Sequence, residues 1–326
     1  MNDNFGSQPH MKTERIAYRG WADACKLSNG VIDLVVLTEV GPRVAFFGSS
    51  GGANQLHEIA EQSGLTSGGE FRIYGGHRLW VSPEVERTYY PDNHPVTVAV
   101  GSPSVLFTAQ PEDDPPGTGL RKQIEIALEP GAAHATLVHR IRNGFQQATE
   151  LSPWAITVMA GGGKAILPLP SRAPFSPQSL LPTGGLVLWS YTDLADPRWT
   201  IGTKYLQLRQ KANAAFRFQE QMGGIYSPLG WAAYFREGQL FVKRAEVVPG
   251  AIYPDFGCNL EVFTDPHSLE VETLGPLVKL APGEEVVHRE DWWLFSGLPA
   301  GEGDAWVDEV VLPAVERAVL SVSFGA

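Results

Sequence analysis

The segment KQIEIALE (residues 122–129) decides the fold class of this chain. Ile124, Ile126 and Leu128 alternate with polar or small residues, so the apolar side chains fall on one face of an extended strand. Prolines and glycines are spread along the whole length and cut the rest into short apolar runs. We therefore predict strands throughout the chain, with the same alternation at VIDLVVLT (31–38), HATLVHRIRN (134–143), GLVLWSY (185–191), YLQLR (205–209) and AFRFQEQ (215–221).

The second half of the chain continues this pattern until its last segment. WAAYFREGQLFVKRAEV (231–247) consists of two strand-like runs around Arg-Glu-Gly, which is typical of a hairpin. DAWVDEVVLPAVERAVLS (304–321) has helical spacing instead, and Pro313 is expected to kink or split that helix. Further strands are expected at NLEVFT (259–264), LEVETL (269–274) and EVVHREDWWLF (285–295).

These elements predict an all-β protein, one large antiparallel β-sandwich with a short C-terminal helix. We assign residues 1–20 to an N-terminal extension and residues 21–326 to a single domain, because no composition break divides them. The proline-rich segment 169–185 is expected to form a loop. Two interpretations of that loop are open: it covers a binding face, or it is a plain surface excursion.

Composition and charge exclude several classes of function. The net charge is −11 without a run of Lys or Arg, which argues against nucleic-acid and anionic-membrane surfaces. Cys25 and Cys258 are too few for a disulfide framework, and the N-terminal segment lacks an apolar signal core, so we expect a soluble, cytoplasmic protein. The eight histidines form no HxH or HExxH pair, so we expect no metal and no cofactor, although distant residues could still assemble a metal site. The sequence does not indicate an oligomeric state.

FRIYGGHRLWVSPE (71–84) carries more recognition chemistry than a turn requires. Beyond its Gly-Gly pair, strand alternation sends His77 to one side and Arg78 and Trp80 to the other. A guanidinium fork beside a flat indole suits a sugar, which offers hydroxyl groups and an apolar ring face. The alternative is that Trp80 belongs to the core and that Arg78 pairs with a nearby glutamate such as Glu84.

Two further segments offer polar groups or aromatic plates. In YPDFGCNLEVFT (253–264), Asp255 lies at the entry of a strand, and Asn259 and Glu261 lie along one face of it. Glu261 is a candidate general base if it faces a polar cavity, and a solubilising residue if it faces solvent. Trp154 follows Pro153 at the start of another strand and is either a core residue or a stacking platform.

Together these segments resemble the galactose mutarotase-like superfamily, the aldose 1-epimerase type of β-sandwich (supersandwich), and more closely a bacterial group with a GGHRLW segment. The resemblance implies a glutamate base on a late strand, about twenty residues before a PGE turn. Glu261 stands at that distance from PGEE, whereas Glu270 and Glu272 are too close to it. The resemblance is carried by LSNGVIDLVVLTEVGPRVAFFG (27–48), IYGGHRLWVSPE (73–84), HRIRNGFQQATELSPWAITVMAGGG (139–163) and GCNLEVFTDPHSLEVETLGPLVKLAPGEEVVHREDWWLF (257–295).

The chain departs from the family where the catalytic acid is expected. At that place it has Trp154, whose indole does not exchange a proton at neutral pH. We expect His77 to replace the acid, with Arg78 or Lys204 donating hydrogen bonds to the substrate. The acidic balance favours a free sugar, whereas a local cluster of Arg72, Arg78 and Lys204 would favour a phosphorylated one.

Three functions are compatible with these residues. The first is a carbohydrate-recognising aldose 1-epimerase-type isomerase that uses Glu261 and His77. The second is a non-catalytic sugar-binding module in which Trp80 and Trp154 stack on the ligand and Arg78, Asp255 and Asn259 bind it. The third is a component of a polysaccharide lyase or hydrolase. In each case the expected partner is a small-molecule carbohydrate.

Overall fold

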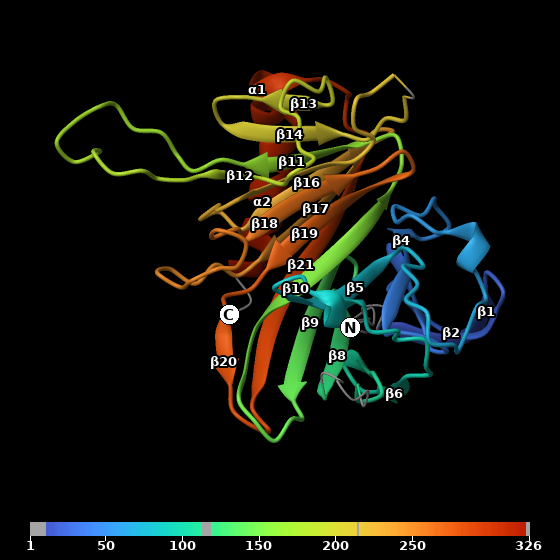
Figure 1. Ribbon diagram of the computed structural model, residues 1–326. Coiled ribbons are helices and arrows are strands. Elements are labelled where there is room, and N and C mark those ends of the chain that lie inside the picture. The colour runs from blue at the N-terminus through green and yellow to red at the C-terminus, as the bar shows by residue number, and fades with distance from the viewer. Residues whose placement is uncertain (1–10, 113–118, 214, 324–326) are drawn as a thin grey trace, which may run out of the picture.

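A computed structural model of the chain describes residues 11–112, 119–213 and 215–323. Two antiparallel sheets pack face to face, as the sequence predicted (Figure 1). The larger sheet has eleven strands. In spatial order they are β1 (Lys12–Tyr18), β2 (Trp21–Ser28), β3 (Ile32–Leu37), β4 (Arg43–Ser49), β5 (His77–Ser82), β10 (Thr149–Ala160), β19 (Ser268–Leu274), β18 (Leu260–Thr264), β15 (Gln221–Ile225) and β12 (Leu186–Leu188), with β20 (Val278–Leu280) paired to the far end of β10.

The smaller sheet has ten strands. In spatial order they are β13 (Trp199–Ile201), β14 (Tyr205–Arg209), β11 (Lys164–Pro168), β16 (Trp231–Arg236), β17 (Gln239–Ala245), β21 (Glu285–Ser296), β9 (His134–Asn143), β8 (Leu120–Leu128), β7 (Ser104–Thr108) and β6 (Thr97–Val100). Short helical turns η1 (Ala60–Gln62) and η2 (Glu86–Tyr89) interrupt the loops around β5.

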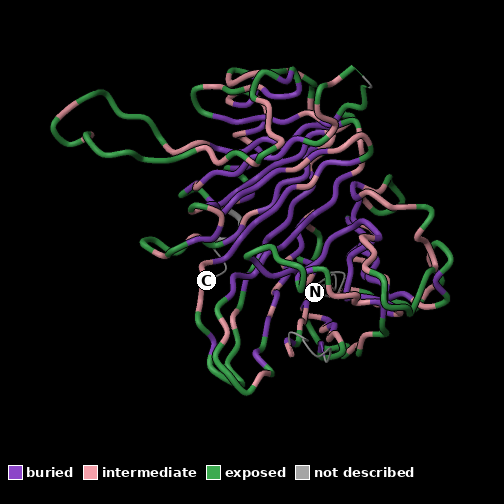
Figure 2. The backbone as a smooth tube through the Cα atoms, viewed as in Figure 1, coloured by how far each residue is buried: buried purple, intermediate pink, exposed green. Residues whose placement is uncertain are grey.

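The main core lies between the two sheets, where the central strands are buried along most of their length (Figure 2). Ile124 and Ile126 of β8 are fully buried there and Leu128 is nearly so, which confirms the alternation that decided the fold class. The predicted hairpin at 231–247 is also confirmed, because β16 and β17 pair around Glu237 and Gly238.

The C-terminal helix covers the outer face of the smaller sheet. It consists of α1 (Gly303–Trp306), a π-helical turn η3 (Val307–Val311) and α2 (Leu312–Ser323), so the helix is irregular immediately before Pro313, as expected. Trp306, Val307 and Val311 pack against Trp231 and Phe235 of β16. The helix therefore occupies one outer face of the sandwich and leaves the outer face of the larger sheet for other uses.

Two segments differ from the sequence analysis. The run 215–221 is not a strand: only Gln221 belongs to one, and the Arg198 guanidinium bonds the carbonyls of Phe218 and Gln219, which therefore cannot join a ladder. The larger sheet begins at Lys12, so it takes in part of the segment 1–20. Residues 1–10 of that segment lie outside the described residues.

The segment 169–185 projects from the body between β11 and β12 as a long loop (Figure 1). Phe175 and Leu181 are turned to solvent, 91% and 82% exposed, whereas Leu169 at the base of the loop packs against the main core. The loop is thus a surface excursion. No helix among the described residues combines the length and the apolarity needed to cross a bilayer.

Candidate functional site

Some of the predicted recognition residues, among them Arg78, Trp80, Trp154 and Glu261, meet on the outer face of the larger sheet, over β5, β10, β19 and β18. Strand register brings them together: Trp80 lies opposite Trp154, and Glu261 lies opposite Glu272. Directly paired residues of antiparallel strands share a face with Cβ atoms about 4.5–5.5 Å apart. Segments far apart in the sequence thereby form one patch.

The aromatic part of this patch is a packed group of four rings. The centroids of Trp80 and Trp154 are 5.4 Å apart at 71°, an edge-to-face arrangement. Phe71 and Tyr89 lie 5.4 and 5.1 Å from Trp80 and complete the group. Trp80 and Trp154 are 6% and 5% exposed, so they form a buried floor, and Tyr89 is the more accessible ring at 42%.

Arg78 is held beneath these rings. Its Cζ lies 4.0 Å from the centroid of Trp80 and 5.3 Å from that of Phe71, a cation–π arrangement on both. Burial and, secondarily, Arg43 lower the pKa of Arg78 to about 10. The alternation that put Arg78 beside Trp80 is confirmed, but the fork is turned to the aromatic rings rather than to solvent.

Five acidic side chains surround the aromatic floor, and we call them the carboxyl cluster: Glu84, Asp255, Glu261, Glu270 and Glu272. Glu261 is 1% exposed and Glu272 is fully buried. Trp154 Nε1 donates to Glu272 Oε2 at 2.6 Å, so the indole that stands where the resemblance implies an acid holds a carboxyl group. Among the described residues, Glu272 Oε1 and both oxygens of Glu261 have no hydrogen-bond partner; the thiol of Cys258 is the polar group next to Glu261.

These carboxyl groups hold their protons to unusually high pH. Burial raises the pKa of Glu261 well above its ordinary value, and the neighbouring Glu272 raises it further. The pKa of Glu272 is also raised well above its ordinary value, mainly by burial and then by the neighbouring Glu270. Burial raises the pKa of Glu270 to about 7, against the opposing effect of Arg78. Two facing carboxyls that cannot both ionise can supply an acid and a base.

The rim of the cluster is a strained turn before β18. Asp255 and Phe256 both have left-handed backbone angles, with φ of 49° and 58°, which non-glycine residues seldom adopt. Ser82 Oγ donates to Asp255 Oδ2 at 3.1 Å, and this bond ties the turn to β5. Phe256 is 99% exposed beside it. Strain of this kind collects at ligand sites.

Gly224 of β15 allows Glu261 to fit. It lies directly opposite Glu261, and a Cβ placed there would meet Cys258 Sγ at 2.6 Å and Glu261 Cγ at 3.0 Å. A larger residue would therefore displace the carboxyl or the thiol. The glycine keeps space for the glutamate against the strained turn.

His77 does not share this site, which corrects the prediction that it supplies the acid to Glu261. The two-residue period that places Arg78 outside places His77 on the inner face, and it is fully buried between the sheets. There it belongs to a group that we call the interior cluster: His77, His139, Lys243, His288 and Glu290. A sheet's thickness separates it from the carboxyl cluster.

Hydrogen bonds join the members of the interior cluster to one another. Lys243 Nζ lies 2.8 Å from Glu290 Oε1, and Trp292 Nε1 donates to Glu290 Oε2 at 2.8 Å. His139 Nδ1 donates to a carbonyl at 2.9 Å, so in the neutral ring its Nε2 accepts from His77 Nε2 at 2.8 Å. Burial lowers the pKa of His77 and of His139, which keeps both rings neutral.

The residues with metal-ligand character also lie in the interior cluster. Ligand atoms of His77, His139 and Glu290 lie within 4.8 Å of one another, assembled from three strands, as the sequence analysis left open. The ammonium of Lys243 already neutralises Glu290, however. The donor set therefore does not match the excess negative charge that usually attracts a divalent ion.

Three more predicted residues have other partners. Lys204 pairs with Asp308 at 2.6 Å beside the C-terminal helix, in a cavity of about 480 Å³ on the other sheet. Arg72 bonds the carbonyl of Ser67 in its own loop, so the proposed phosphate cluster with Arg78 and Lys204 does not form. The amide of Asn259 exchanges two hydrogen bonds with the backbone of Ser227 and is used up in holding that loop.

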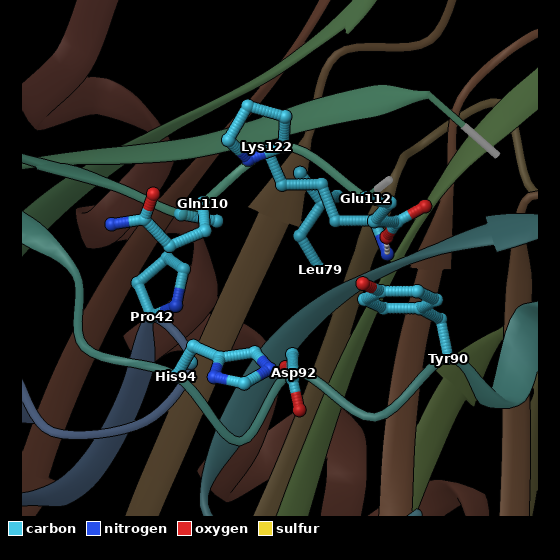
Figure 3. A pocket seen from close by; sticks show the side chains of 11 residues that line it. Pro42, Leu79, Tyr90, Asp92, His94, Gln110, Glu112 and Lys122 are labelled. Carbon is cyan, nitrogen blue, oxygen red and sulfur yellow. Dashed lines mark ion pairs between the residues drawn. The ribbon is translucent and has the colours of Figure 1, made fainter. Parts of the chain in front are cut away.

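A small pocket opens at the inner side of β5 (Figure 3). Leu79, Tyr90 and His94 line it together with the ion pair of Lys122 and Glu112, 2.7 Å apart. Its volume is about 20 Å³, close to the space one water requires. It is too small for a sugar and includes no member of the carboxyl cluster.

The sequence analysis missed Glu270 and Glu272 as site residues. Their distance from the PGE turn removed them from consideration as the base. A different signal was present, since alternation in LEVETL puts both on one face, two residues apart. Tyr89 and Phe71 were missed because their contacts with Trp80 come from loops.

Comparison with known proteins supports the fold. No family model matches the chain, and no curated protein does. Among solved structures, the Slr1438 protein of Synechocystis sp. PCC 6803 matches with a TM-score of 0.55 and 11% identity over 91% of this chain and 100% of that one. A galactose mutarotase-like protein of Lactobacillus casei ATCC 334 matches with a TM-score of 0.53 and 10% identity over 83% and 100% of the chains. A galactose mutarotase related enzyme of Lactobacillus acidophilus matches with a TM-score of 0.51 and 9% identity over 84% and 98%. The chain has the galactose mutarotase-like β-sandwich fold.

Proposed function

We propose that the protein is a carbohydrate-binding isomerase of the aldose 1-epimerase type, with Glu261 and Glu272 as its acid–base pair. The strongest support is that Glu261 and Glu272 lie opposite each other on paired strands beside the aromatic floor. Both carboxyl groups are buried, and both have oxygens without a hydrogen-bond partner. Buried polar groups without partners are rare, and they mark sites where a ligand completes the bonding. Glu261 keeps the role of base that the family resemblance implies.

The reaction needs one ionised and one protonated carboxyl. Glu261 takes the proton of the C1 hydroxyl while Glu272 protonates the ring oxygen, the C1–O bond of the ring breaks, and the aldehyde closes again on its other face. The indole of Trp154 donates to Glu272 Oε2 and so leaves Oε1 to carry the transferred proton. Trp154 is then a positioning residue for the acid rather than the acid itself.

Access to the pair requires a local movement. Glu261 is 1% exposed, and the turn before β18 lies against it through Cys258. In this proposal the strained turn at Asp255 and Phe256 opens when the sugar enters. The same turn then closes water out of the site.

Anomeric exchange measured by NMR saturation transfer tests the proposal. The protein should accelerate the exchange of an aldose, and Glu261→Gln should slow it roughly 10²–10⁴-fold, the usual contribution of a positioned base. Glu150→Gln is the matched control, because Glu150 is an exposed carboxyl on β10 of the same sheet. The Glu150→Gln variant should accelerate anomeric exchange as much as the wild type does.

The second candidate is the non-catalytic sugar-binding module, favoured by the tryptophan at the family's acid position. Sugars that bind to the wild type without faster exchange would establish that function and exclude the isomerase. Absence of any contact with mono- or oligosaccharides would exclude both.

A further inference from the structure

The carboxyl cluster combines five acids with few cations. Its acidic side chains come from β18, β19, the turn before β18 and the loop after β5; Arg78 lies among them, and Lys243 acts on Glu272 from the inner face of the sheet. That guanidinium is already stacked on Trp80 and Phe71 and bonds the carbonyl of Ile73. The patch therefore gathers five carboxyl groups beside a guanidinium that is already engaged, and Glu270, with a pKa of about 7, supplies negative charge above that pH.

The unpartnered oxygens point to the kind of ligand that is missing. Glu272 Oε1 and both oxygens of Glu261 have no partner within the described part of the chain, and both residues are at most 1% exposed. A buried polar atom without a partner destabilises the folded protein. An ammonium group offers three donors and a positive charge, so it satisfies carboxyls better than a hydroxyl does.

The same arrangement disfavours anionic sugars. A phosphate or uronate group would add negative charge beside Glu270 and would find one guanidinium that is buried under Trp80 and Phe71, with its free Nε enclosed. The Arg72 and Lys204 side chains that could have held a phosphate lie elsewhere. The charges around the site thus favour neutral or cationic sugars over anionic ones.

We infer that the site takes amino sugars, hexoses in which an ammonium replaces a hydroxyl, with the ammonium against Glu270 and its neighbouring carboxyls. The inference rests on the proposed function, because it names the substrate class of the same site. Glu270 is the suitable contact: it lies on β19 two residues before Glu272, and it is partly exposed whereas Glu261 and Glu272 are buried. A cationic ligand can reach it without first opening the turn at Asp255.

Groups from several elements act on Glu270. Arg78 of β5 lowers its pKa, whereas Asp265 of the β18–β19 turn and Glu84 of the loop after β5 raise it; burial has the largest effect and brings the pKa to about 7. Phe263 and Val158, its cross-strand neighbours, are apolar. The carboxylate therefore forms as the pH rises through about 7, and the preference for an ammonium should grow up to the pH at which the amino sugar loses its own proton.

Titration of the protein with four sugars tests the inference. The probes are glucosamine, glucose, N-acetylglucosamine and glucose 6-phosphate, followed by ligand-observed NMR and isothermal titration calorimetry on the full chain. At pH 7.5 glucosamine should bind roughly tenfold or more tightly than glucose, since bonds to charged groups are the strong ones. N-acetylglucosamine has the same nitrogen without the charge and should lose this advantage, and glucose 6-phosphate should bind weakest.

Glu270→Gln separates charge from shape. It should abolish the preference for glucosamine over glucose, with circular dichroism showing that the variant is folded. Glu150→Gln, the exposed control, should keep the preference. If Glu270→Gln fails to fold, lowering the pH to 5.5 must shrink the preference in the wild type instead.

The possible results distinguish the two proposals. Equal affinities for glucosamine and glucose, or tightest binding of glucose 6-phosphate, would overturn the amino-sugar inference and leave the proposed function in place. No binding of any of the four sugars would remove the proposed function and the inference with it. A preference that survives in Glu270→Gln would overturn the assignment of the contact.

Discussion

The carboxyl cluster and the interior cluster lie on opposite faces of the same sheet, and they treat a buried glutamate in opposite ways. Glu290 of the interior cluster is fully buried and accepts bonds from Lys243, Thr273 and Trp292. Burial by itself would raise its pKa, but the ammonium of Lys243, followed by the three histidines of the cluster, outweighs burial, so the pKa is lowered. Glu261 is equally buried without partners, and its pKa is raised.

The difference separates a structural use of polar residues from a functional one. A buried charge that has all its bonds contributes to a unique packing of the two sheets. A buried carboxyl without bonds costs stability and persists where a ligand uses it. Both clusters are polar and sequestered, so burial by itself does not identify the site; the state of hydrogen bonding does.

Removing the lysine of the interior cluster should have the largest effect on stability. Lys243→Met leaves Glu290 charged and buried without its cation, so the free energy of unfolding should fall by about 3–5 kcal/mol. Urea denaturation followed by circular dichroism measures it. Glu261→Gln, by contrast, should change stability at pH 4 by less than about 1 kcal/mol, because the carboxyl of Glu261 is then largely protonated in the folded and the unfolded state and is neutral like the amide.

A double variant tests whether the loss comes from unbalanced charge. Lys243→Met combined with Glu290→Leu removes both charges and should recover part of the lost stability, since apolar replacement of a whole buried pair is often neutral. If the double variant is less stable than Lys243→Met, the pair acts through packing. The contrast between the two clusters would then lose its electrostatic basis.

Sequence alternation predicted which residues of β5 share a face. It placed His77 opposite in face to Arg78 and Trp80, which the strand register confirms. It could not show that both faces of β5 are buried, so His77 was wrongly given to the site of Glu261. A period of two fixes relative sides, and tertiary packing decides what each side meets.

The other contacts of the site residues could not be predicted from the sequence, because the residues that meet are far apart along the chain. Glu261 meets Glu272 through a strand pairing, Lys204 meets Asp308 of the C-terminal helix, and the Asn259 amide meets the backbone of Ser227. The number of residues between the members of each pair follows no helical or strand period, so no local sequence pattern predicts these contacts. The fold class, by contrast, depends on alternation within single strands, which is local and could be predicted.

The two clusters should also give opposite dependence of stability on pH. In the carboxyl cluster the folded pKa of Glu261 and Glu270 lies above the ordinary 4.5, so the folded state holds protons that the unfolded state has lost, and stability falls as the pH rises through about 5–7. In the interior cluster the folded pKa of His77 and His139 lies below the ordinary 6.5, so stability is complete above 6.5 and falls as the pH decreases. Above pH 6.5 the carboxyl cluster therefore dominates.

Denaturation of wild type and Glu261→Gln between pH 5 and 8 checks this sign. The variant cannot ionise at this position, so its stability relative to wild type should increase with pH by up to about 1.4 kcal/mol per pH unit. Glu150→Gln should run parallel to the wild type, since Glu150 is exposed. Parallel curves for all three proteins would mean that Glu261 ionises freely and is not buried as a protonated acid.

The smallest expected effect is that of zinc on the wild type. His77, His139 and Glu290 converge as metal ligands do, but Glu290 is already paired with Lys243, so a divalent ion would leave an uncompensated charge of about +2 in a fully buried site. Excess Zn²⁺ should therefore shift the Tm of the wild type by less than about 1 °C. Lys243→Met lacks the competing ammonium and leaves two imidazoles and a carboxylate, a known zinc set, so zinc should stabilise this variant more than the wild type. If the wild type bound zinc stoichiometrically and His139→Gln abolished that binding, the interior cluster would be a metal centre. A buried glutamate with all its hydrogen bonds would then no longer indicate a purely structural role.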